Sequence, residues 1–199
     1  MMSYKSFLSS LFLVAVSQAA AAAQGSLLED KKLALKAVLV LSPEFCAAVK
    51  KQGDKFWTGE EKFEIGKADC AELEPALRAV FAELTRVDGV PSTANAGQLV
   101  LMPRLADASA TRPTQITIFN KPTKEMVVVL EWTAKDSSGK TVWIETIQGT
   151  TQHRRGMMES VKKNVKLMAE AAVKDAAEKS AAKMASSPEL QKLAASREP

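Results

Sequence analysis

Two cysteines and one histidine are the side chains of this sequence best suited to chemistry. Cys46 and Cys70 are the only cysteines, and His153 is the only histidine. A structural zinc site needs four donors, which these three residues do not supply, so we expect no metal site. The cysteines form no C-x-x-C redox motif. In an oxidising compartment an even pair is typical of a disulfide, and closure of the loop 46–70 would stabilise the protein by roughly 3 kcal/mol.

Catalysis by a nucleophile would need a base, for which His153 is the candidate. No G-x-S-x-G elbow and no glycine-rich phosphate loop is present. The alternative is that His153 is a loop residue in a basic cluster. Paired carboxylates, Glu60 with Glu61 and Glu72 with Glu74, could form a glycosidase dyad, but their positions favour solvated faces. We therefore expect no enzyme activity and no cofactor.

Positive charge gathers around the start of the last predicted helix. The formal net charge is +4 and the sequence pI is about 9.0. The cluster consists of His153, Arg154, Arg155, Lys162, Lys163 and Lys166. Aromatic residues do not alternate with these cations, so we expect no nucleic-acid binding. The cluster is instead a candidate interaction surface for an acidic partner or an anionic envelope surface, with a solvated helix face as the alternative.

Two tryptophans lie on the strands of a predicted hairpin. The runs EMVVVLEWTAKD and KTVWIETIQGTT flank turn residues 136–139. Pairing of Asp136 with Gly139 would place Trp132 opposite Trp143. This arrangement indicates core packing on one face of the hairpin. The alternative is a pocket at Trp132 and Trp143, which would make the protein a small-ligand carrier.

The other elements follow from the spacing of apolar residues. A strand of about five residues is expected within the apolar run 37–45, which Pro43 stops, and further strands over 98–107 and 114–119. A long helix is expected over 157–185, with a further turn after Pro188. A helix is expected to begin at Asp69, because Glu72 gives the capping-box spacing. Its apolar face would comprise Leu73, Leu77, Val80, Phe81 and Leu84. Residues 46–61 are expected to be irregular or a short helix. This order predicts one α/β (α+β) domain, with a mainly antiparallel or mixed sheet of about five strands covered by two main helices.

The first residues have the pattern of a secretory signal peptide. Lys5 precedes an apolar run over 7–16 and small residues over 19–23. The run is too short for the roughly 20 apolar residues of a membrane span, so we expect cleavage near Ala23, no transmembrane span and a periplasmic location. Residues 24–36 would be a flexible lead or short helix, and residues 37–195 the single domain. No cysteine follows the apolar run before Cys46, so no lipid anchor is expected.

Several phrases of the sequence resemble known envelope proteins. They are FEIGKADCAELEPALRAVF, QLVLMPRLAD, VVVLEWTAKDSSGKTVWIETIQGT and SSPELQKL. They are similar to patterns in small envelope lipoproteins and in relatives of the amino-terminal domain of the Tol translocation β-propeller protein, including lipoprotein activators of penicillin-binding proteins. The resemblance covers about residues 37–195, without the lipidation cysteine. It implies a mixed sheet with packed helices, and a role in envelope protein contacts. We therefore expect a soluble periplasmic accessory or binding protein with an envelope protein as its partner.

Overall fold

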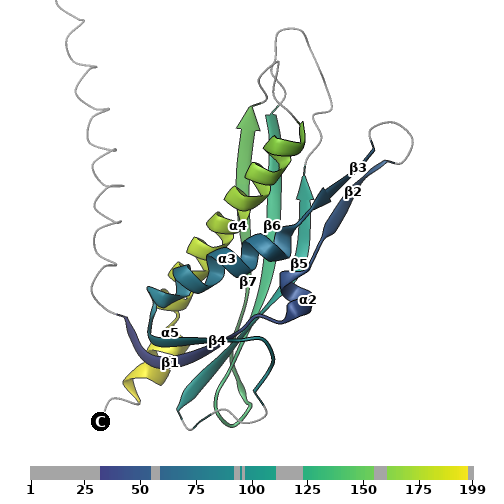
Figure 1. Cartoon of the computed structure of the whole chain (residues 1–199). Coiled ribbons are helices and arrows are strands. Elements are labelled where there is room, and N and C mark those ends of the chain that lie inside the picture. The colour runs from purple at the N-terminus through teal and green to yellow at the C-terminus, as the bar shows by residue number, and fades with distance from the viewer. Residues whose placement is uncertain are drawn as a thin grey trace, which may run out of the picture. The chain divides into compact units, whose positions relative to one another are not determined.

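A five-stranded sheet is the centre of the fold (Figure 1). The computed structural model describes residues 32–54, 59–91, 95, 97–110, 123–154 and 161–196. The strand order is β4-β1-β5-β6-β7. The strands are β1 (Leu33–Val40), β4 (Phe81–Val87), β5 (Gln98–Ala110), β6 (Thr123–Lys135) and β7 (Thr141–Arg154). β1 runs parallel to both neighbours, whereas β5, β6 and β7 pair antiparallel, so the sheet is mixed as predicted.

Helices cover one face of this sheet (Figure 1). They are α2 (Pro43–Cys46), α3 (Ile65–Arg78), the long α4 (Val161–Ser186) and α5 (Pro188–Ala195). α4 packs on β6 and β7 and contacts α3, and α5 packs on β1. Strands and helices contribute buried side chains to the same apolar core. The predicted fold class and the long C-terminal helix are confirmed. Within the described ranges, no helix has the length and apolar character needed to cross a membrane.

β1 begins and ends earlier than the sequence predicted. The expected strand of about five residues lay within 37–45, before Pro43, but β1 starts at Leu33, so the end of the expected flexible lead is strand. Leu33 and Leu35 are buried in the core and Lys36 is exposed, which is the alternation of a half-buried strand. The chain leaves the sheet after Val40 because Ser42 caps a helix: its Oγ accepts a hydrogen bond from the Phe45 N–H at 3.2 Å.

The helix predicted from Asp69 is two elements. α3 starts four residues earlier, at Ile65, and ends at Arg78, after which the chain enters β4 at Phe81. Phe81 and Leu84 are buried, but as residues of a strand. Their spacing from Leu73 fits a helix by coincidence. Asp69 is buried inside α3 and does not cap it, because the buried stripe already begins at Ile65.

A small hairpin replaces the irregular segment expected over 46–61. Strands β2 (Lys50–Asp54) and β3 (Gly59–Phe63) pair antiparallel in a separate two-stranded sheet. Phe63 is the one apolar side chain of this hairpin that the structure describes, and it is in the core. The polar composition therefore concealed the strands. The strand predicted over 114–119 lies outside the described residues.

The β6–β7 hairpin is confirmed, but its predicted register is wrong. Trp132 pairs with Glu145, and Trp143 pairs with Ala134. A register shift lies between Ala134 and Lys135, beside a turn closed by the Asp136 N–H and the Lys140 carbonyl at 2.9 Å. Both indoles still belong to the core, since the displacement is by two residues and keeps the face of each side chain.

α4 closes the β7 edge of the sheet. An added Cβ at Gly149 would lie 2.1 Å from the Ala172 carbonyl oxygen, so only glycine permits this close approach. The Asp175 carboxylate accepts a hydrogen bond from the Thr150 N–H at 2.7 Å. Lys179 donates to the Gln148 carbonyl at 3.2 Å. Two polar groups of an edge strand are thus satisfied by one helix.

Candidate functional site

The opposite edge strand, β4, presents free backbone groups. The Val87 carbonyl accepts from the Leu41 N–H at 2.9 Å and therefore points toward β1. Backbone groups alternate along a strand, so those of Leu84 and Arg86 point away from the sheet. In the described part of the chain, nothing hydrogen-bonds to these groups. Such an edge is a template on which another strand can pair.

An open groove of about 540 Å³ lies between this edge and α3. α3 contributes Glu74 and Arg78, and the β4 side contributes Leu84, Thr85, Arg86, Val87 and Asp88. The strand register places Arg86 beside Leu39 of β1, whose side chain is in the core beneath the helices. The Arg86 side chain therefore lies on the helical face of the sheet, in the groove.

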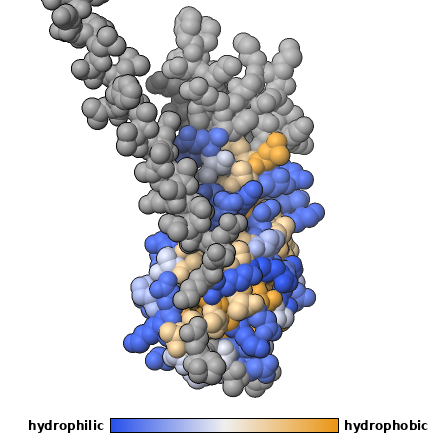
Figure 2. Space-filling view, turned by 90° about the vertical axis from the view of Figure 1, so that its left-hand side faces the viewer, coloured by the Kyte–Doolittle hydropathy of each residue, from blue (hydrophilic) through white to orange (hydrophobic). Residues whose placement is uncertain are grey.

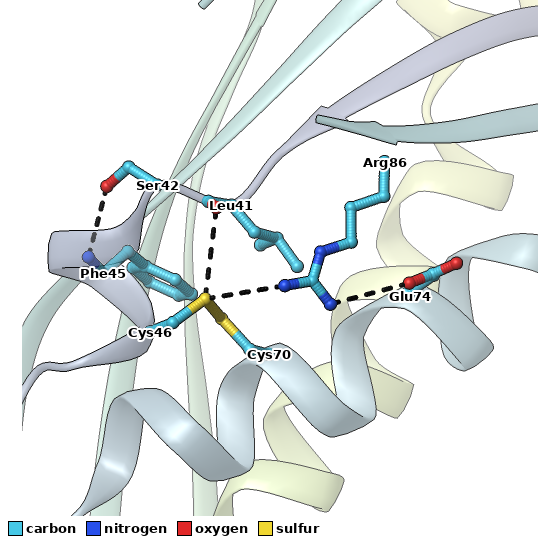
Figure 3. The surroundings of a disulfide bond; sticks show 7 residues. All are labelled: Leu41, Ser42, Phe45, Cys46, Cys70, Glu74 and Arg86. Carbon is cyan, nitrogen blue, oxygen red and sulfur yellow. Dashed lines mark hydrogen bonds and ion pairs between the residues drawn. A yellow bond between two sulfur atoms is a disulfide. The ribbon is translucent and has the colours of Figure 1, made fainter. Parts of the chain in front are cut away.

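Two arginines share one carboxylate in this groove. Arg78 donates to Glu74 Oε1 through two nitrogens, at 3.1 and 2.6 Å. Arg86 forms an ion pair with Glu74 Oε2 at 3.8 Å, beyond hydrogen-bond distance, and donates to the Cys46 sulfur at 3.9 Å (Figure 3). Arg86 is exposed, with 36% of its side-chain surface accessible to solvent. Its guanidinium therefore faces the groove with donors that Glu74 does not occupy.

The predicted disulfide is confirmed and holds α3 beside the groove. Cys46 of α2 is bonded to Cys70 of α3, with Cα atoms 5.6 Å apart (Figure 3). The two helices also meet at Gly66, where an added Cβ would lie 2.0 Å from the Phe45 carbonyl oxygen. The Gly66 N–H donates to the Ala48 carbonyl at 3.0 Å. A covalent bond and a close backbone contact thus fix the first half of α3.

A buried carboxylate precedes the disulfide in α3. Asp69 has no exposed surface, and neither of its oxygens has a hydrogen-bond partner within the described ranges. Burial raises the pKa of Asp69 to about 7. Asp69 is therefore a polar group without a described partner on the buried side of α3, the helix that forms one wall of the groove.

The predicted basic surface lies mostly outside the described side chains. β7 continues through His153 and Arg154, so the expected loop position of His153 is wrong: the residue pairs with Lys124. Lys162 and Lys163 belong to α4, and Arg155 is not among the described residues. Lys166 is exposed, and its Nζ atom lies 3.8 Å from Glu170 Oε1. The interaction role of this cluster stays a prediction.

The two tryptophans pack in the core rather than line a site. Trp132 is fully buried, and its indole N–H donates to Ser180 Oγ at 2.9 Å. Ser180 in turn donates to the Ala176 carbonyl at 2.7 Å. Trp143 is 8% exposed. The core interpretation is confirmed, and the polar group of Trp132 is already used.

The groove residues were not found from the sequence. Glu74 and Arg78 have the i,i+4 spacing of a helical ion pair, which was a usable signal. Arg86 was missed because the preceding residues were assigned to a helix. Of the paired carboxylates, Glu72 and Glu74 lie on α3, and the side chains of Glu60 and Glu61 are outside the described ones. In the described ranges, no group of three or more His, Cys, Asp or Glu could hold a metal ion.

No protein-family model and no curated protein matches the chain. A solved structure of a neuraminyllactose-binding haemagglutinin homologue from Helicobacter pylori is similar, with TM-score 0.51 and 10% identity over 84% of this chain and 91% of that one. A DUF330 protein from Xanthomonas campestris gives TM-score 0.49 and 8% identity over 84% and 90%. A minor lipoprotein from Acinetobacter baumannii gives TM-score 0.47 and 12% identity over 78% and 93%. These identities show the fold alone.

The prediction of no lipid anchor is wrong by this comparison. The Acinetobacter baumannii protein and two other similar structures are described as lipoproteins, which are lipid-anchored proteins. The prediction rested only on the late position of Cys46, which the structure places in a disulfide. None of these structures is described as a Tol protein or an activator of a penicillin-binding protein, so that closer resemblance stays a prediction.

Proposed function

We propose that this is an accessory protein of the bacterial envelope that binds another protein along the β4 edge, on the periplasmic side of the membrane. The open edge carries the proposal: the backbone groups of Leu84 and Arg86 point outward, whereas α4 occupies the corresponding groups of β7. A protein that binds by strand addition uses main-chain hydrogen bonds of this kind.

The alternatives have less support. A carrier pocket at Trp132 and Trp143 would need indoles that are free to contact a ligand, but both pack in the core. The face shown in Figure 2 is mainly hydrophilic, with smaller apolar areas between the polar side chains, which does not favour a broad apolar interface there. We assign the protein no catalytic role. The basic cluster from His153 to Lys166 remains a second proposed contact surface.

Site-specific photo-crosslinking in the envelope tests this function. A photoreactive amino acid would replace Thr85 on β4, with Thr146 on β7 as the matched control, since both threonines are exposed on edge strands. We expect one reproducible protein adduct at position 85 and none at position 146. Adducts at both positions, or at neither, would contradict contact through the β4 edge. A third variant would carry the photoreactive amino acid in place of Lys166, and adducts in this variant alone would move the contact to the basic cluster.

A further inference from the structure

We propose that the segment bound at β4 is an extended strand that carries a carboxylate opposite Arg86. This inference rests on the proposed function and specifies the chemistry of its partner. Three features of the groove lead to it: the direction of the free backbone groups, the sharing of Glu74 by two arginines, and the placement of the other charges near β4.

The backbone of β4 requires an extended occupant. The outward N–H and C=O groups of Leu84 and Arg86 lie two residues apart, which is the repeat with which one strand hydrogen-bonds to another. A bound helix would already use its own backbone groups internally. Only an extended segment can satisfy these groups of β4 and also place side chains in the groove beside α3.

The guanidinium of Arg86 selects a carboxylate. Glu74 forms its hydrogen bonds to Arg78, so Arg86 shares a carboxylate whose hydrogen bonds go to another arginine. A guanidinium presents a planar fork of donors that matches the two oxygens of a carboxylate. Arg86 contacts both Glu74 and the sulfur of the disulfide, so its position is better fixed than that of a side chain without partners. An acidic side chain of the occupant would complete this cluster.

The remaining charges near β4 restrict the register. Asp88 follows Arg86 by two residues and also lines the groove, so a neutral or basic residue should face it. Glu83 lies on the opposite face of β4 from Arg86, and its Oε2 atom is 2.9 Å from the Nζ atom of Lys36. The occupant should therefore present an acid at the Arg86 position, but not at the Asp88 position.

A second copy of the chain fits these requirements less well. Directly opposite residues of two paired strands share a face, and Glu83 and Arg86 lie on different faces of β4. Self-pairing of β4 therefore cannot place Glu83 against Arg86. Asp88 could face Arg86 only if two strands paired about Val87, at the end of β4, which would leave the backbone groups of Leu84 unpaired.

Three blocked peptides test the inference with the full protein. Their sequence is acetyl-Thr-Val-Thr-X-Thr-Val-Thr-amide, with Glu, Gln or Lys at X, and binding is followed by the amide NMR shifts of Leu84 and Arg86. We expect the Glu peptide to bind about threefold more tightly than the Gln peptide, and the Lys peptide to bind most weakly. Arg86→Gln should abolish this difference and Arg86→Lys should keep part of it. Arg104→Gln, an exposed change on β5 outside the groove, should leave it unchanged.

The outcomes separate the two proposals. Equal binding of the three peptides at β4 would overturn the carboxylate and leave the contact function intact. A preference for Glu that persists in Arg86→Gln would also overturn it. No shift at β4 with any peptide, together with no adduct at position 85, would overturn both proposals. A concentration-dependent dimer that shifts these amides without peptide would replace the partner with a second copy of the chain.

Discussion

The two edge strands of the sheet differ in how their outer groups are satisfied. At β7, α4 lies so close that residue 149 must be glycine, and Asp175 and Lys179 bond the strand's outward groups. At β4, α3 stands beside a groove, and its polar side chains pair with arginines instead of the strand backbone. One edge is closed by a helix, and the other has outward backbone groups without a described partner.

The comparison extends to one aspartate of each helix, α4 beside β7 and α3 beside β4. Asp175 of α4 is bonded to both Thr150 and Lys179, whereas Asp69 of α3 is buried without a described partner. Unpaired backbone groups of an edge and an unpaired buried carboxylate both cost stability relative to their satisfied counterparts. Of the two helices, α3 thus carries the aspartate without a described partner, whereas the aspartate of α4 is satisfied.

Asp69→Asn should produce the largest change. Burial raises the folded-state pKa from 3.8 to about 7, so between these pH values the folded carboxyl keeps a proton that the unfolded chain has lost. Stability of the native protein should therefore fall as pH rises from 4 to 7. The variant should be more stable at pH 8, by up to about 4 kcal/mol, and change little at pH 4. Urea denaturation of both proteins across this pH range measures the difference in stability. The same dependence of stability on pH in the native protein and the variant would contradict the prediction.

Replacement of Cys46 and Cys70 by serine should have the next largest effect. The bridge ties α3 beside β4, and its loss should lower the free energy of unfolding by about 3 kcal/mol while the fold is retained. Chemical denaturation measures the loss, and far-ultraviolet circular dichroism controls for folding. Alkylation with and without reductant should show no free thiol in the native protein. Two freely alkylated cysteines before reduction would show that the bridge is absent.

Gly149→Ala should weaken the closed edge by about 2 kcal/mol. The added methyl group would meet the backbone of α4, so the helix must move away from β7. Gly89→Ala, just after β4, is the matched control, because nothing lies within 4 Å of its added Cβ. Its stability should change by less than about 0.5 kcal/mol. Similar losses in the two variants would show that α4 does not pack as closely on β7 as described.

Asp175→Asn should have the smallest effect, about 1 kcal/mol at pH 7. Partial burial favours a higher pKa for Asp175, but hydrogen bonds from Lys179 and Thr150 outweigh it and lower the pKa below the usual 3.8. This stabilisation is complete above the unfolded pKa and is lost as pH falls through the lower folded value. Native protein and variant should therefore converge in stability at low pH. Hydrogen exchange at the Thr150 amide gives a local measurement, and unchanged exchange at pH 7 would contradict the edge contact.

The local patterns of the sequence determined the elements that depend on neighbours along the chain. Alternation of apolar residues around the turn at Asp136 and Gly139 gave the last hairpin, and a long run without glycine or proline gave α4. The even pair of Cys46 and Cys70 gave the disulfide. In the groove, only the i,i+4 spacing of Glu74 and Arg78 was visible, because it needs no contact from outside its own helix.

Contacts between distant segments decided the rest. The apolar spacing from Leu73 to Leu84 fits one helix, but packing against β1 makes its second half a strand and so brings Arg86 back beside Glu74. The pairing of Asp136 with Lys140 instead of Gly139, together with the register shift beyond Ala134, displaced the tryptophan pairing by two residues. Which edge stays open depends on where α4 crosses the sheet, and the burial of Asp69 depends on the elements packed around α3. The spacing of residues along the sequence determines neither the open edge nor the burial of Asp69, because both depend on surfaces that meet only in the folded chain.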